Sequence, residues 1–77
     1  MSMINTSDEE KVIYELIHNN YDDCIPRYIL EGILLYDYGY TPTRVYNVIM
    51  NLTLSEVMEL ILKSDGEYYQ LTGELMG

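Results

Sequence analysis

The 77-residue sequence has a single cysteine, Cys24, a single histidine, His18, and neither Phe nor Trp. One Cys excludes an intrachain disulfide, and one Cys with one His excludes a structural zinc site built from these residues. No apolar run approaches the roughly 18 residues of a membrane-spanning helix. The segment Met1–Thr6 lacks the basic and apolar regions of a signal peptide. We therefore expect one domain, residues 1–77, in the cytoplasm, stabilised by aliphatic packing, with self-association or a partner as a further source of stability.

Residue patterns that carry catalysis are also missing. His18 has no Ser, Cys or second ligand at a spacing that would position it for acid–base work. Cys24 follows Asp22 and Asp23, whose negative charge disfavours the thiolate. No Gly-rich phosphate loop occurs, and the acidic pairs do not have the alternating spacing of a calcium loop. The sequence therefore predicts a protein that is not an enzyme and holds no cofactor and no metal.

The charge is strongly one-sided. Thirteen Asp and Glu stand against four Lys and Arg, which gives a net charge of −9. Such a surface repels nucleic acid and anionic membranes, since binding DNA requires cations. It attracts basic surfaces and accelerates encounter with them. We expect a partner protein with a basic surface, no direct nucleic-acid binding and no membrane binding, with acidity that only aids solubility as the alternative.

Two helices are predicted in the first half of the chain. The first is capped by Thr6 or Ser7 and ends near Asn19-Asn20. The second is capped by Asp23 and has Pro26 in its first turn. Its apolar run over 28–36 predicts the most buried helix, with Gly32 packed closely against a neighbouring backbone and Gly39 as its left-handed stop. The first helix has an inner face of Val12, Ile13, Leu16 and Ile17.

Two further helices and a strand are predicted in the second half. Thr41-Pro42 begins the third helix, whose inner face is Val45, Val48, Ile49 and Leu52. Thr53 and Glu56 form a capping box for a fourth helix that runs to Lys63, with Gly66 after it. The segment 67–72 is strand-like, and Asp65-Gly66 is typical of a hairpin turn, so a hairpin with 57–63 extended is the alternative. The predicted fold is mainly α: a compact bundle of about four short helices with a helix-turn-helix-like core and a short C-terminal strand or hairpin.

The strand 67–72 needs a partner for its backbone N–H and C=O groups. Pairing with the same strand of a second copy would bury Tyr69 and Leu71, and two-fold dimers are common. The charge of −9 on each copy opposes this. A homodimer formed through this segment is therefore an open alternative to a monomer.

Tyrosines next to carboxylates mark the candidate binding surface. The chain has nine Tyr, and a Tyr at a helix end is often half-exposed because its hydroxyl needs water or a partner. Aromatic residues are enriched in protein–protein interfaces. Tyr that merely replaces Phe in the core is the alternative. The predicted partner-binding residues are Asp22, Asp23, Asp37, Tyr38, Tyr40, Glu56 and Glu59.

The segment from Ile25 to Leu52 resembles a helix-turn-helix. The run Thr41-Pro42-Thr43-Arg44-Val45-Tyr46 looks like the start of a recognition helix in winged-helix regulators, and the segment 65–72 looks like their wing strand. The resemblance implies a dimeric transcription regulator that binds DNA through the helix starting at Pro42. Only Arg44, Asn47 and Asn51 are available to contact DNA, and no other Lys or Arg surrounds them, which departs from that use.

In general character, the chain also resembles the small acidic anti-defence proteins of phages and mobile elements, including anti-CRISPR inhibitors. Some of these imitate the charge of DNA. This resemblance implies an inhibitor that works in the host cytoplasm and occupies the basic groove of a nucleic-acid-handling protein. It assigns no residue roles.

Overall fold

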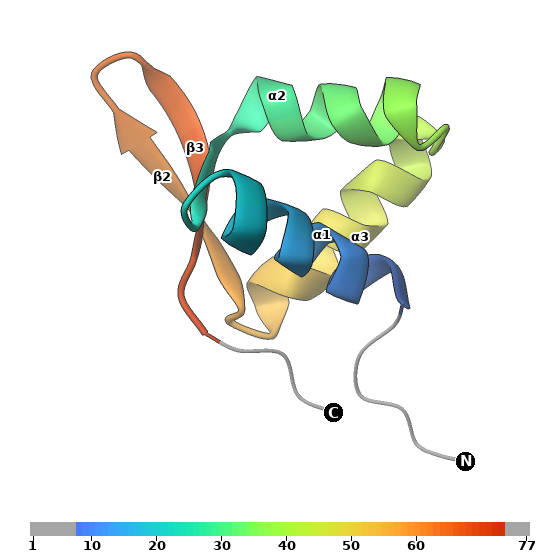
Figure 1. Ribbon diagram of the computed structural model, residues 1–77, viewed down its shortest axis with the longest axis horizontal. Helices are drawn as coiled ribbons and strands as arrows, with labels where there is room; N and C mark the ends of the chain where they lie inside the picture. The colour runs from blue at the N-terminus through green and yellow to red at the C-terminus, as the bar shows by residue number, and fades with distance from the viewer. Residues whose placement is uncertain (1–7, 74–77) are drawn as a thin grey trace.

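The computed structural model describes residues 8–73 and folds them into helices packed on a three-stranded antiparallel sheet (Figure 1). The elements are α1 (Asp8–Asn20), β1 (Cys24–Pro26), α2 (Arg27–Gly32), η1 (Ile33–Asp37), α3 (Pro42–Leu54), β2 (Met58–Lys63) and β3 (Gly66–Leu71). In Figure 1, α2 crosses the top and the hairpin β2–β3 stands at the left. The predicted mainly α bundle is therefore wrong, because the fold is mixed α/β.

The first predicted helix is confirmed. Helix α1 ends at Asn20, and Ile13 and Ile17 on its inner face are fully buried. Val12 is 42% exposed and so lies off this face. The predicted caps Thr6 and Ser7 lie outside the described residues.

The second helix begins later than predicted. Asp23 does not cap it, because Asp22 and Asp23 both adopt positive φ and turn the chain into β1. Pro26 precedes the helix with an extended backbone and makes no side-chain cap. The helix continues through η1, where the Tyr38 N–H donates to the Ile33 carbonyl at 3.0 Å. Gly39, at φ 73°, then ends it as predicted.

Two expectations about this second helix are wrong. It is buried along one face only: Leu30 and Leu34 are fully buried, whereas Tyr28 and Tyr36 are 75% and 84% exposed. Gly32 does not pack against a neighbouring backbone, because a Cβ at this position would meet nothing within 4 Å. The apolar run therefore supplies two partly exposed flanks as well as a core face.

The third helix is confirmed in start and face. The Thr41 hydroxyl accepts a hydrogen bond from the Arg44 N–H at 3.1 Å, and Pro42 occupies the first turn. This cap satisfies one of the N–H groups that a helix start leaves free. All four predicted inner residues are buried: Val45, Val48, Ile49 and Leu52.

The fourth predicted helix is absent from the described residues and a hairpin takes its place. Thr53 belongs to α3, where its hydroxyl donates to the Met50 carbonyl at 2.9 Å instead of capping a new helix. Glu56 turns the chain at φ 64°, and Met58–Lys63 forms β2. Ladder pairing with β3 overrides the local helix preference of this segment, as tertiary context commonly does. The alternative with both arms extended is confirmed.

Strand β3 is the centre of the sheet, whose order is β1-β3-β2. Ile25 of β1 pairs with Tyr69 on one side, and Leu60 of β2 pairs with Tyr69 on the other. The backbone groups of β3 are thus satisfied within one chain, by β2 and by β1, which lies where the second helix was expected to begin. The segment 67–72 therefore pairs its backbone without a second copy, and Tyr69 is buried within the single chain; a homodimer stays a prediction.

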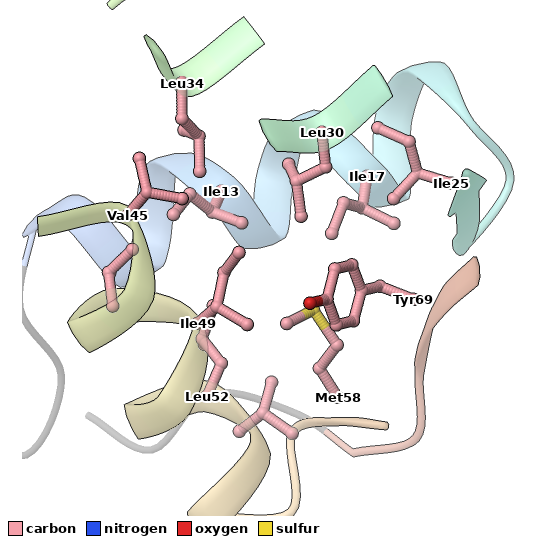
Figure 2. Packing of buried hydrophobic residues seen from close by; sticks show 12 residues of the cluster. Ile13, Ile17, Ile25, Leu30, Leu34, Val45, Ile49, Leu52, Met58 and Tyr69 are labelled. Atoms are coloured by element: carbon pink, nitrogen blue, oxygen red, sulfur yellow. The ribbon is translucent and has the colours of Figure 1, made fainter. Parts of the chain in front are cut away.

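The core lies between the helices and the sheet (Figure 2). Its most deeply buried members come from every layer, including Ile17, Ile25, Leu30, Leu52 and Met58. Among the described residues, the hydroxyl-bearing Tyr69 is the one buried side chain that is not purely hydrocarbon or thioether. Within residues 8–73, no helix combines the length and the apolar character that crossing a membrane requires.

Candidate functional site

Three of the predicted acidic residues lie in two turns that flank the end of β3. Asp22 and Asp23 form the turn after α1, and the Asp23 carbonyl accepts a hydrogen bond from the Leu71 N–H at 2.9 Å. Glu56 lies in the turn after α3, and its carbonyl accepts from the Thr72 hydroxyl at 3.1 Å. The path of β3 thus places residues 22–23 and residue 56 at the same end of the sheet.

The side chains at this end of the sheet are largely free to meet a partner. Asp22, Glu56 and Glu59 are exposed. Glu59 lies on β2 opposite Gln70, one pair from the end of the ladder. Asp23 is half-buried, and its Oδ1 lies 2.7 Å from His18 Nδ1. The four predicted acids therefore share one region, which we call the sheet-end acids: Asp22, Asp23, Glu56 and Glu59.

The remaining predicted residues lie elsewhere. Asp37 is the last residue of η1, and Tyr38 and Tyr40 follow it in the connection to α3, which Figure 1 places at the opposite end of the long axis from the sheet. Tyr38 and Tyr40 pack edge to face with ring centroids 5.9 Å apart. The Arg44 guanidinium also lies over the Tyr40 ring, 4.1 Å from its centroid. The predicted site therefore divides into two groups and does not form one surface.

Three of the four Lys and Arg are engaged by the protein's own side chains. Arg27 bridges α2 and β3: its Nε donates to Glu31 at 2.9 Å and its Nη1 donates to Glu67 at 2.8 Å, and these bonds raise the pKa of Arg27. Arg44 pairs with Glu9. Lys63 Nζ lies 4.4 Å above the Tyr68 ring. Lys11 is exposed on α1. Most of the acidic surface therefore has no nearby cation to compensate it.

The outer face of α3 carries amides but little positive charge. Asn47 and Asn51 are exposed, and Tyr46, which precedes Asn47, is 62% exposed. Arg44, the single cation on α3, is held by Glu9 and lies over Tyr40. A helix that reads DNA relies on cations to contact the phosphates. The arrangement of α3 does not provide them.

A groove that the sequence analysis missed opens between α2–η1, α3 and the hairpin. Its volume is about 550 Å³. Met58 and Ile49 lie at its base, whereas Arg27 and Glu31 bring charge to it. It is lined by Arg27, Glu31, Leu35, Pro42, Val45, Tyr46, Ile49, Met50, Thr53, Met58, Glu59, Leu60 and Tyr69. The alternation of Met58, Leu60 and Leu62 was the available signal, and it requires the hairpin interpretation.

Tyr69 gives this groove a polar group. Its ring points from β3 into the cluster between the helices and Met58 (Figure 2), and the residue is only 5% exposed. Burial raises the pKa of Tyr69, an effect that the positive charge of Arg27 opposes. Among residues 8–73, nothing forms a hydrogen bond with its hydroxyl. A buried polar group without a partner is costly, and such groups are rare in native proteins.

In the described part of the chain, no three His, Cys, Asp or Glu side chains gather in a way that could hold a metal ion. His18 contacts Asp23 and stacks on Tyr14 at 5.8 Å between ring centroids. Cys24 is a half-buried free thiol on β1. What the surface offers is therefore charge, exposed aromatic rings and an apolar groove.

Comparison with protein-family models, with curated proteins and with solved structures finds no match to this chain.

Proposed function

We propose that this protein is a non-enzymatic, acidic protein-binding module that docks on the basic surface of a partner. The observation that carries the proposal is the excess of uncompensated negative charge. The net charge is −9, and three of the four Lys and Arg are engaged by the chain's own carboxylates or aromatic rings. Such a surface attracts basic partners over a Debye length and repels DNA.

The general character of anti-defence inhibitors makes the proposal more specific. The partner handles nucleic acid, its basic groove normally receives a phosphate backbone, and this module occupies that groove in the cytoplasm of the host. The sheet-end acids are the first contact that we propose, because the fold gathers them at one end of the sheet. Tyr38 and Tyr40 lie too far along the molecule to belong to the same contact and form a second one with Asp37.

A capture experiment with paired variants tests this function. The protein is used as bait in a host lysate, and captured proteins are eluted by a salt gradient. We expect a basic protein that elutes at raised salt, because surface charges are screened. Asp22→Asn with Glu56→Gln should weaken capture more than Asp8→Asn with Glu15→Gln, which removes the same charge from α1. Capture that resists salt, or that yields no basic protein, would contradict the proposal.

The second candidate function is DNA binding by a helix-turn-helix regulator. The observation that favours it is the succession of α2, a short turn, α3 and a hairpin, together with exposed Asn47 and Asn51 on α3. A gel-shift assay with random duplex at low salt separates the two candidates, because non-specific affinity comes from cationic contacts. The first proposal expects no retention. Retention that Arg44→Gln abolishes would favour the regulator.

A further inference from the structure

The groove between α2–η1, α3 and the hairpin has two features that suit a binding partner: exposed apolar walls and a hydroxyl group without a hydrogen bond. Its apolar walls extend into exposed surface: Leu60 is 44% exposed, and Tyr46 on the opposite wall is 62% exposed. At its base, the hydroxyl of Tyr69 has no hydrogen-bond partner in the described part of the chain. Leu60 and Tyr69 are paired neighbours on β2 and β3, so their side chains share the sheet face that turns toward the groove.

We infer that this groove seats an amphipathic, cationic helix of the partner protein. The inference rests on the proposed function and names the element of the partner that is recognised. Apolar side chains of that helix lie over Ile49 and Met58, and one polar group of the helix accepts a hydrogen bond from the Tyr69 hydroxyl. Lys or Arg at the border of its apolar face pairs with Glu31 or Glu67, the two carboxylates beside Arg27.

The volume and the shape fit this occupant. A groove of about 550 Å³ lies within the ordinary range of pockets that bind a compact apolar group. It is open between two helices and the face of a hairpin, so it offers side chains and not a row of free backbone groups. Recognition of an amphipathic helix in an apolar groove uses this kind of surface, whereas an added strand would need a sheet edge.

The charges of the groove favour a cationic helix over the other possible occupants. Arg27 is the one cation that lines it, and Arg27 is bound by both Glu31 and Glu67. Two carboxylates thus stand against one cation, so this border of the groove is net negative. A second copy of this chain brings a charge of −9 and is repelled, and an anionic lipid surface is repelled for the same reason. A partner helix with Lys or Arg complements the border.

A tryptophan-labelled peptide makes the test direct, since the protein itself contains no Trp. The probe is a helical peptide of about four turns with Leu on one face, Lys on the other and one Trp among the Leu. We expect its emission to shift to shorter wavelength on binding, as the Trp enters the groove, and we expect a matched peptide with Glu in place of Lys not to bind. The binding should weaken as salt is raised.

Two protein variants and one control locate the binding. Leu60→Ser removes an apolar wall, and Tyr69→Phe removes only the unpartnered hydroxyl; the latter should weaken binding roughly three- to tenfold, the usual worth of one hydrogen bond. Leu54→Ser is the matched control, because Leu54 is 73% exposed and does not line the groove. Thermal unfolding of each variant shows that it is folded, and Tyr69→Phe should be no less stable than the parent.

The outcomes separate this inference from the proposed function. Peptide binding that Leu60→Ser and Tyr69→Phe weaken, and Leu54→Ser does not, supports the groove. Peptide binding that all three variants leave unchanged overturns the groove inference while salt-sensitive capture of a basic partner stands. A dimer of this chain that Leu60→Ser dissociates, measured by analytical ultracentrifugation, would also overturn it by showing that a second copy fills the groove.

Discussion

Two glycines seven residues apart, Gly32 and Gly39, should respond in opposite ways to the same substitution. Gly32 lies within the helix at φ −64° and ψ −42°, and Gly39 ends the helix at φ 73°. A Cβ added at either position meets nothing within 4 Å. Because both sites have room for a methyl group, the difference between Gly32→Ala and Gly39→Ala isolates the backbone conformation.

The magnitudes follow from the conformation of each residue. Ala is the better helix former by about 0.8–1.0 kcal/mol, so Gly32→Ala should raise the free energy of unfolding by up to about 1 kcal/mol. In the left-handed region a side chain costs roughly 1–2 kcal/mol, so Gly39→Ala should lower it by that amount. For a domain of this size, 1 kcal/mol corresponds to about 4–8 °C in Tm.

Thermal unfolding followed by circular dichroism, with urea titration as the second measure, distinguishes the two variants. Gly32→Ala should melt several degrees above the parent, and Gly39→Ala several degrees below. A Gly32→Ala protein that melts lower would refute the reasoning, since it would require a close neighbour at a place where the structure has open space. Equal effects at the two glycines would refute it as well.

Three other predictions concern single contacts. Thr41→Ala removes the cap of α3 and should cost about 1 kcal/mol in urea unfolding, whereas Thr41→Ser should retain most of it. Leu30→Ala empties a fully buried site and should cost about 2–5 kcal/mol by the same measurement; a smaller loss would mean that α2 closes over the space. Burial raises the pKa of Tyr69, so the unfolded state loses its proton first, and stability should fall as the pH rises through about 10, the unfolded value. Unfolding in urea near pH 8 and near pH 10.5 measures this, and Tyr69→Phe should reduce the slope; an unchanged slope would show that other tyrosines account for it.

Local signals predicted the helices that depend on local interactions. The inner faces of α1 and α3 follow a helical period, and Thr41-Pro42 carries its own cap, so these elements could be predicted from adjacent residues. Strand β1 has no such signal: three residues, Cys24–Pro26, are extended because Gln70 and its neighbours lie beside them. The segment that forms β2 has a local preference for helix, and its strand exists because β3 pairs with it.

The candidate surface was predictable only in part for the same reason. The excess of carboxylates is a property of composition and needed no structure. Which carboxylates lie together depends on β3, whose end contacts the turns of Asp23 and Glu56. The groove was not predictable without the hairpin, because its walls come from α2, α3 and β2, and no short stretch of sequence contains all three.

The central place of β3 also determines when the sheet can form during synthesis. Strand β1 pairs only with β3, and β2 pairs only with β3, among the described strands. A ribosome-bound chain that has been made only as far as α3 therefore cannot form the sheet. Ile25 can pair only after Tyr69 has been made, and more than forty residues lie between the two. Closing such a loop is slow relative to forming a helix. The nascent protein should remain a set of unanchored helices, accessible to chaperones and proteases, until β3 has emerged.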